Sequence, residues 1–308
     1  MVAVLRRGLI RASDVLLPLA LAAGALALIA PSDAVAERSD LFLAALVLFT
    51  ALAIAPSELA RLRARKAELA ALVLAPFALL VPLAWVASRP FDGSVADGVL
   101  ALGVASTEVA AVGMVTLAGG RAALALGALT GSLVVAALAG PPLLSLLAGG
   151  GSSGIAVGEL VARFALVVIV PLLSGLAVRA AVPRLGHAEG ELGGLAAVTV
   201  AALVYGALSG AGADGDLLAA TGAGALFLVL STVPVAAWIA IAPRDLRLTG
   251  GFVIGLRDFA VAAALASQAF GPAAATVAGV YGVLMLLVGA AGTQLLRARA
   301  ARVESHRP

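Results

Sequence analysis

The 308-residue sequence contains no cysteine, only two histidines and few charged residues. Without cysteine the chain can form neither a disulfide framework nor a thiolate metal site, and it has no cysteine nucleophile. His187 and His306 fall in a predicted loop and in the tail, which argues against a histidine-based metal site. Charged residues make up 12% of the chain, whereas soluble proteins carry about 25%. This scarcity of charge indicates an integral membrane protein.

Long apolar runs take up most of the chain, which is 62% hydrophobic. About 20 apolar residues are enough to cross a bilayer. Ten such runs occur, at residues 13–31, 40–59, 68–87, 97–118, 121–148, 158–180, 192–211, 217–242, 249–270 and 272–295. We therefore predict an all-α integral membrane protein with ten transmembrane helices.

The first run has an alternative interpretation as a cleaved signal peptide. Arg6, Arg7 and Arg11 precede it, and the small residues Ala34-Val-Ala36 that follow resemble a signal-peptidase site. We favour an uncleaved first membrane helix, because the predicted topology requires it.

Basic residues are unevenly divided between the connecting segments. One side holds 16 of the 20: Arg6, Arg7, Arg11, Arg61, Arg63, Arg65, Lys66, Arg121, Arg179, Arg184, Arg244, Arg247, Arg297, Arg299, Arg302 and Arg307. The other side holds Arg38 and Arg89 with Asp33, Glu37, Asp92, Asp214 and Asp216. The positive-inside rule then places both termini in the cytoplasm. We expect a multi-pass protein of a bacterial inner membrane, with the lipid bilayer and not a nucleic acid as its partner.

Ten helices divide into two halves of five, residues 1–150 and 151–308, the second ending in a short cytoplasmic tail. An odd number of helices per half makes the halves opposite in orientation, so a repeat between them is inverted. Leu16-Leu-Pro-Leu-Ala-Leu-Ala-Ala-Gly24 and Ile169-Val-Pro-Leu-Leu-Ser-Gly175 are weakly similar at an offset near 150.

Three ionisable residues fall near the middle of predicted helices, namely Glu108 in 97–118 and the adjacent pair Arg257-Asp258 in 249–270. A charge at this depth costs at least about 2.5 kcal/mol. A shift of 150 residues places Glu108 on Asp258, so the charges occupy equivalent helices of the two halves. Inverted-repeat transporters bind substrate and ions where discontinuous helices cross at the midplane.

We therefore expect both helices to be unwound and to form a substrate and ion site, without a resident metal or catalytic residue. Its predicted members are Ser106, Thr107, Glu108, Thr130, Arg257, Asp258 and Gln268. A structural alternative is one buried ion pair between Arg257 and either carboxylate. The hydroxyls of Thr130, Ser132, Ser231 and Thr232 can also serve only their own helices. Arg163, beside Glu159, is expected to be an interfacial anchor or a local ion pair.

These stretches resemble the bile acid:sodium symporter family, a relative of arsenite permeases and auxin-efflux-like carriers. Gly255-Leu-Arg-Asp-Phe-Ala-Val-Ala-Ala-Ala-Leu-Ala266 stands where the family has Gly-Met-Gln-Asn-Ser-Gly-Leu-Ala-Ala-Ala-Leu-Ala. Gly103-Val-Ala-Ser-Thr107 stands where it has Gly-Thr-Ala-Ser-Asn, and Leu117–Leu126 and Thr130-Gly-Ser132 are also similar. The resemblance implies a panel domain of helices 1, 2, 6 and 7 and a core domain of helices 3–5 and 8–10. Helices 4 and 9 would cross in the core, and substrate would bind between the two domains.

The sequence departs from the family at the residues that hold sodium. Val253 and Arg257 occupy the places of a glutamate and a glutamine ligand, and Thr107 replaces an asparagine. A guanidinium carries only donors and cannot ligate sodium. We therefore expect Arg257 to replace one sodium, with Glu108 or Asp258 pairing with it or carrying a proton. No cofactor is expected, and the coupling ion is sodium or a proton.

Three functions are compatible with this pattern. The first is secondary active transport of a small organic anion by alternating access, without the full sodium sites of the family. The second is cation/proton antiport through Glu108 and Asp258, and the third is a non-transporting sensor or structural subunit. An enzyme is not expected, because the predicted spans carry no histidine, lysine or zinc motif, and no phosphate-binding loop supports ATP-driven transport.

Overall fold

The computed structural model of the chain describes residues 16–149, 156–209 and 217–305, which are mostly helical and contain no strand. Several residues used in the predicted topology lie outside the described residues: Arg6, Arg7, Arg11, Asp214, Asp216, His306 and Arg307. The start of the predicted span 13–31 and the end of 192–211 fall outside them as well.

The first half of the chain contains α2 (Leu16–Ile29), α3 (Asp33–Ala36), α4 (Ser39–Ala53), α5 (Pro56–Arg61), the 3-10 helix η1 (Leu62–Arg65), α6 (Lys66–Ser88), α7 (Gly93–Val104), α8 (Val109–Leu117) and α9 (Ala122–Leu147). The second half contains α10 (Val157–Phe164), the π-helical turn η3 (Ala165–Ile169), α11 (Val170–Ala181), the 3-10 helix η4 (Pro183–Ala188), α12 (Glu189–Ser209), α13 (Leu217–Ile241), α14 (Arg247–Gly255), α15 (Phe259–Phe270) and α16 (Pro272–Ser305).

Six helical stretches of the described residues are long and apolar enough to cross a membrane: Pro56–Ser88, Ala122–Leu147, Val157–Ala181, Pro183–Ser209, Leu217–Ile241 and Pro272–Gly292. Shorter apolar helices accompany them. The helix predicted at 40–59 ends early, at Ala53, because Pro56 starts the separate helix α5 and favours its first turn. Large apolar side chains such as Leu218 and Ile241 are exposed, as expected of a surface that faces lipid.

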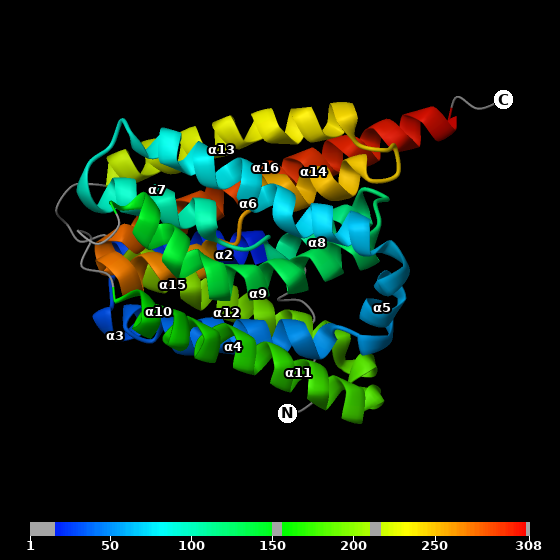
Figure 1. Cartoon of the computed structure of the whole chain (residues 1–308), viewed down its shortest axis with the longest axis horizontal. Helices are drawn as coiled ribbons and strands as arrows, with labels where there is room; N and C mark the ends of the chain where they lie inside the picture. Colours follow the sequence, from blue (N-terminus) through cyan, green and yellow to red (C-terminus); the bar gives the residue numbers. More distant parts are fainter. Residues whose placement is uncertain (1–15, 150–155, 210–216, 306–308) are drawn as a thin grey trace.

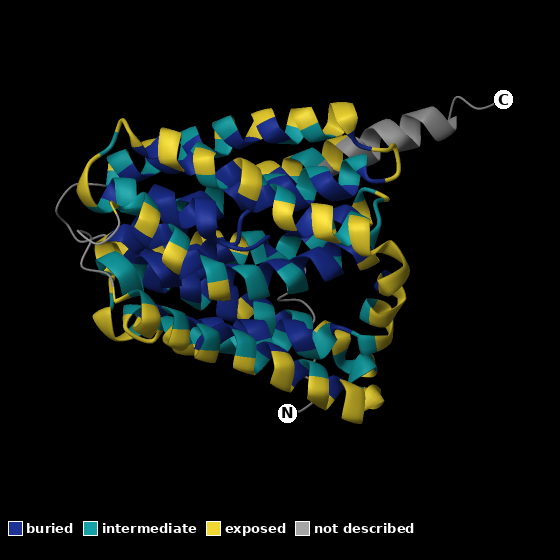
Figure 2. Ribbon diagram, in the orientation of Figure 1, coloured by how far each residue is buried: buried dark blue, intermediate teal, exposed yellow. Residues whose placement is uncertain are grey.

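The helices pack in two groups (Figure 1). The panel layer consists of α2, α4, α10–η3–α11 and α12, in which α12 packs on α2 and α4, and α11 packs on α4. The crossing layer consists of α6 to α9 and α13 to α16. Figure 2 shows the buried residues gathered in the middle of the molecule, between α13 at the top of the view and α11 at the bottom.

Two of the predicted helices are interrupted, as expected. The segment 97–118 is divided into α7 and α8, and the segment 249–270 into α14 and α15. Glu108 and Asp258 have extended backbone angles and start α8 and α15, and each carboxylate accepts a hydrogen bond from the first turn of its helix. A carboxylate at this position stabilises a helix start, so the two acidic residues help to explain where the helices resume.

Candidate functional site

The two interruptions lie against each other and pair in antiparallel fashion at Thr107 and Arg257. The backbone N–H of Glu108 donates to the carbonyl of Leu256 at 3.0 Å, and the N–H of Asp258 donates to the carbonyl of Ser106 at 2.8 Å. Unwound backbone is tolerated at membrane depth only where its polar groups find partners within the protein. Here each interruption supplies the partners of the other, and we call this paired segment, residues 105–108 and 256–258, the crossing.

Asp258 is buried and well supplied with donors. Its Oδ1 accepts hydrogen bonds from the N–H groups of Ala260 and Val261, both at 3.0 Å, and its Oδ2 accepts one from the Ser106 hydroxyl at 3.5 Å. The first turn of a helix favours negative charge, because its N–H groups lack helical partners. The start of α15 therefore supplies two of the three donors that the Asp258 carboxylate accepts.

Glu108 occupies the matching position at the start of α8 but is less well supplied. Its Oε1 accepts one long hydrogen bond, 3.4 Å, from the N–H of Ala110. Its Oε2 is buried and has no hydrogen-bond partner among the described residues. A buried carboxylate oxygen without a partner is costly, so this side chain can gain a proton or a cation at little structural cost.

Arg257 is fully buried at the crossing, with 0% of its surface exposed. Its Nε donates to the carbonyl of Leu102 at 3.4 Å and its Nη2 to the carbonyl of Gly103 at 3.2 Å, while Nη1 has no partner. The guanidinium also lies over the Phe77 ring, 5.0 Å from its centroid. The last carbonyls of a helix carry negative partial charge, so the C-terminal end of α7 holds this cation.

No ion pair joins Arg257 to Glu108 or Asp258 among the residues that the structure describes. The expected alternative of a direct ion pair that locks the two helices is therefore not met. The hydrogen bonds of the buried charged side chains go to helix ends and to a hydroxyl, not to a side chain of opposite charge.

The side-chain contacts of the crossing are also reciprocal. The hydroxyl of Thr107 donates to the carbonyl of Val253 in α14 at 3.2 Å, as Arg257 donates to that of Gly103 in α7. The two donors, Thr107 and Arg257, are 150 residues apart in the sequence. The two acceptors, Gly103 and Val253, are separated by the same 150 residues. The same offset relates the backbone bonds made by Glu108 and Asp258.

A third helix reaches the crossing through Ser132 of α9. The Ser132 hydroxyl accepts the N–H of Thr107 at 3.1 Å and donates to the carbonyl of Leu129 at 3.0 Å. Thr130, which the sequence analysis includes in the site, donates to Leu126 of its own helix at 2.9 Å and makes no hydrogen bond to the crossing. Ser132, which is not among the predicted site residues, makes the contact instead, and Thr130 follows the alternative in which the hydroxyl serves only its own helix.

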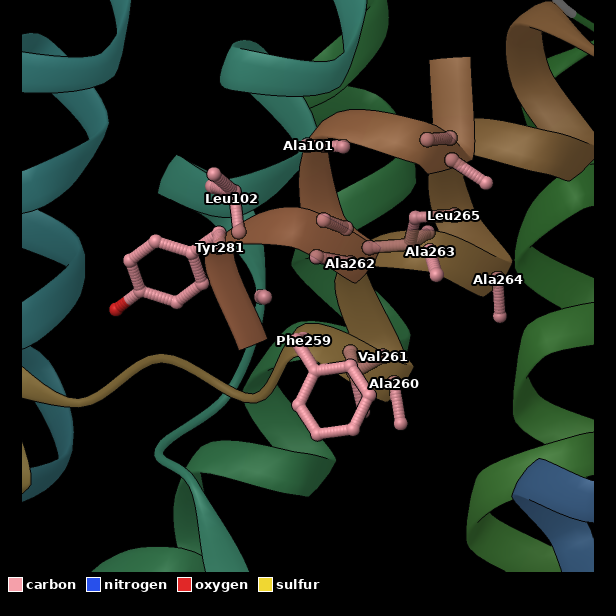
Figure 3. Close-up of a cluster of buried hydrophobic side chains, with 14 of the residues drawn as sticks. Ala101, Leu102, Phe259, Ala260, Val261, Ala262, Ala263, Ala264, Leu265 and Tyr281 are labelled. Atoms are coloured by element: carbon pink, nitrogen blue, oxygen red, sulfur yellow. The ribbon is translucent and has the colours of Figure 1, made fainter. Parts of the chain in front are cut away.

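Two aromatic residues complete the surroundings of Arg257, and the sequence analysis misses both. The Tyr281 hydroxyl accepts the backbone N–H of Arg257 at 3.1 Å, and Phe77 lies under the guanidinium. Tyr281 is fully buried, and Figure 3 shows it in the apolar cluster that includes Leu102 and Phe259. A tyrosine inside an apolar run could have indicated a site residue, because its hydroxyl needs a polar partner there. A phenylalanine in such a run, as at Phe77, gives no such indication.

Gln268, the last predicted site residue, lies at the far end of α15 and not at the crossing. Its Nε2 donates to Oδ1 of Asp40 at 2.6 Å, and Arg163 pairs with the other oxygen of Asp40 at 2.7 Å. Arg163 thus pairs with Asp40 of α4 rather than with Glu159 of its own helix. The three side chains line a cavity of about 400 Å³ that also contains Asp33 and Glu37. We call these contacts of Asp40 the polar latch: the bond to Gln268 joins the panel layer to α15, and the ion pair with Arg163 lies within the panel layer.

A second cavity, of about 290 Å³, lies between the layers on the α8 side of the crossing. Its lining comes from both layers: Phe49, Thr50, Ala53, Ile54, Leu192, Gly193 and Ala196 from the panel layer, and Val109, Val112, Leu126 and Leu129 from the crossing layer. Val109 directly follows Glu108. The lining is apolar except for Thr50, whose buried hydroxyl has no partner. We call this space the apolar cavity.

Comparison with known proteins identifies a family for most of the chain. The sequence model of the SBF-like CPA transporter family (DUF4137) matches residues 16–288. The match covers most of the chain and includes both interrupted helices. No curated protein matches the sequence.

Proposed function

The chain belongs to the SBF-like CPA transporter family, and we propose that it is a proton-coupled secondary active transporter of a small organic anion. The observation that carries this proposal is the binding of Arg257 by helix carbonyls without an ion pair to either neighbouring carboxylate. We further propose that it works by alternating access in a bacterial inner membrane, with both termini in the cytoplasm.

The proposed architecture is ten membrane helices in two inverted halves, 1–150 and 151–308. The reciprocal hydrogen bonds of the crossing support it, because Thr107 and Arg257 bond equivalent carbonyls, Val253 and Gly103, at an offset of 150 residues. In this arrangement α7–α8 and α14–α15 are the fourth and ninth helices. The panel layer and the crossing layer are the parts that move relative to one another.

Arg257 takes the place of a coupling cation in this proposal. Carbonyl oxygens at an unwound helix end are groups that coordinate sodium in discontinuous-helix transporters. Here the carbonyls of Leu102 and Gly103 accept hydrogen bonds from the guanidinium instead. A charge fixed to the protein at this place removes the need for a sodium ion.

Glu108 carries the exchangeable proton. The crossing contains one guanidinium and two carboxylates, so it is neutral when one carboxyl is protonated. Asp258 accepts three hydrogen bonds and Glu108 accepts one long one, which makes Glu108 the carboxyl that takes up the proton.

The solute is proposed to bind in the apolar cavity beside Glu108. A space of about 290 Å³ is near the lower end of the range for small-molecule sites. Its apolar lining suits the body of an organic solute better than a bare inorganic cation. The polar latch closes the opposite side of the crossing, so the proposed state is open toward the end of α8.

Uptake into proteoliposomes under imposed ion gradients tests the function. We expect a radiolabelled organic anion found by thermal-shift screening to accumulate under a pH gradient, with or without sodium. Glu108→Gln should abolish the response to the pH gradient and retain solute exchange, because the glutamine cannot titrate. Transport that requires sodium and ignores the pH gradient would exclude the proposal.

A second candidate is cation/proton antiport. It is favoured by the unpartnered Oε2 of Glu108. It is also favoured by the acidic residues Asp33, Glu37 and Asp40, which line the cavity at the polar latch. Arg257→Ala separates the two functions. In sodium-free buffer, anion transport predicts loss of solute binding in this variant, whereas antiport predicts mainly a displaced pH profile with cation exchange retained.

A further inference from the structure

A third cavity, of about 440 Å³, lies at the start of α9 and is lined by three arginines and four apolar residues. Arg61, Arg65 and Arg121 surround it, and Ala122 to Leu124 form its floor with Leu62. Arg61, Leu62 and Arg65 come from α5 and η1, which connect the panel layer to α6. Figure 1 shows α5 at the right of the view. None of its lining residues belongs to the crossing or to the apolar cavity.

The floor of this cavity supplies backbone donors. Arg121 precedes the 26-residue helix α9, and its side chain makes no capping hydrogen bond. The first bond of this turn runs from the N–H of Ala125 to the carbonyl of Arg121 at 3.1 Å. The N–H groups of the three residues between them therefore lack helical acceptors. Such a helix start attracts anions.

The arginines provide more positive charge than their partners neutralise. Arg65 pairs with Glu68 at 3.0 Å, and Arg121 pairs with the same carboxylate at 3.5 Å and with Asp245 at 2.6 Å. Arg61 has no ion pair among the described residues. Three guanidinium groups thus face two carboxylates.

The position of Arg61 and Arg65 over the helix start is fixed by packing. Leu62, between them, is 5% exposed and lies against α9, where a methyl group on Gly127 would collide with its side chain. The short helix η1 is therefore anchored on α9 by its one buried leucine. The flanking arginines remain at the rim of the cavity, and each exposes its side chain.

We propose that Arg61, Arg65 and Arg121, with the first turn of α9, form a binding site for a phosphate group, such as that of an anionic lipid headgroup. Guanidinium groups match phosphate oxygens in pairs, and basic cavities between membrane helices on the cytoplasmic side bind such headgroups. The bound anion competes with Glu68 for Arg65 and Arg121. Because the N–H of Arg121 also donates to Thr249 of α14 at 2.8 Å, the site is connected to one of the crossing helices.

Thermal-shift titration of the detergent-purified full chain with phosphatidylglycerol tests the site. The test variant is Arg61→Gln with Arg65→Gln. The matched control is Arg63→Gln with Lys66→Gln, which removes the same charge from the same segment at positions that do not line the cavity. We expect the wild type and the control to be stabilised at similar lipid concentrations, and the test variant to need at least about tenfold more.

Phosphatidylcholine and inorganic phosphate distinguish the sources of the ligand. A shift with phosphatidylglycerol alone identifies a lipid headgroup site, and an arginine-dependent shift with inorganic phosphate identifies a site for soluble phosphates. Both results support the proposal. Equal shifts in the two double variants, equal shifts with phosphatidylcholine, or no shift with either ligand would overturn it.

Discussion

Thr107 and Arg257 face each other across the crossing, and the side chain of each donates to a carbonyl in the helix that precedes the other. Thr107 bonds Val253 at the end of α14, and Arg257 bonds Gly103 at the end of α7. One position thus carries a neutral hydroxyl and its counterpart a full charge. The crossing is symmetric in its backbone and asymmetric in its electrostatics.

Replacing Arg257 by alanine is expected to make transport sensitive to sodium. The variant frees the carbonyls of Leu102 and Gly103, and a small cation can then occupy the space that the guanidinium fills. Transport is expected to fall strongly in sodium-free buffer and to recover in part when sodium is added. Arg257→Lys is the control, because lysine keeps the charge but lacks the planar guanidinium that donates to both carbonyls at once. An Arg257→Ala variant that ignores sodium contradicts the role of a fixed cation.

Replacing Ser132 by alanine should destabilise the protein, whereas replacing Thr130 should not. Loss of the Ser132 hydroxyl leaves the buried N–H of Thr107 without an acceptor, which costs about 1–3 kcal/mol. Thr130→Ala removes a hydroxyl that bonds only its own helix, so its effect is expected to stay within about 0.5 kcal/mol. The melting temperatures of the two variants in detergent test this difference, and equal values would argue against the assigned contact.

Asp258 is expected to tolerate asparagine better than alanine. Asparagine can still accept hydrogen bonds from the N–H groups of Ala260 and Val261, and it is as good a helix start as aspartate. Alanine loses these bonds at a cost of about 0.5–2 kcal/mol. Thermal unfolding of Asp258→Asn and Asp258→Ala should therefore separate capping from charge. If asparagine is as destabilising as alanine, the charge itself stabilises the crossing.

Weakening the polar latch should shift the protein away from the state described above. The chain has no cysteine, so a single cysteine at Ala196 can report the accessibility of the apolar cavity to a maleimide. Gln268→Ala removes the bond to Asp40 and is expected to slow labelling at position 196 severalfold. Ser267→Ala is the control, because it alters the lining of the cavity at the polar latch without breaking the bond between Gln268 and Asp40. Faster labelling in the Gln268 variant would refute the latch.

The sequence identifies the crossing because charge in an apolar run is rare and costly. Glu108, Arg257 and Asp258 are readable for that reason, and the glycines and hydroxyls around them mark the interruptions. The sequence does not show whether Thr130 or Ser132 faces the crossing. Side chains two positions apart on a helix point in different directions, and only packing sets the rotation of α9 about its axis. The polar latch could not be predicted either, because it depends on packing: the contact of Gln268 with Asp40 joins residues 228 positions apart.

Hydropathy places the end of the second membrane helix at residue 59, whereas α4 ends at Ala53, for a local reason. The apolar run from 40 to 59 continues through Pro56, and hydropathy alone does not separate a membrane helix from the short helix that follows. Proline at the first position of α5 marks the boundary. The same boundary positions Arg61 over the start of α9, so the cavity proposed to hold phosphate could not be inferred from charge counting.

A cation that is part of the polypeptide has a thermodynamic consequence for the proposed cycle. A free sodium ion is left behind on the other side of the membrane, and its gradient then supplies work on every turn. Arg257 returns with the empty carrier, so it supplies no net work over a cycle. With Glu108 protonated and the anion bound, the crossing and its solute carry one net negative charge, and the empty crossing with Glu108 deprotonated carries the same charge. Each of the two steps therefore responds to voltage, by up to about 2.3 kcal/mol per 100 mV for a full crossing. The membrane potential is expected to alter the rate of turnover without adding to the accumulation ratio.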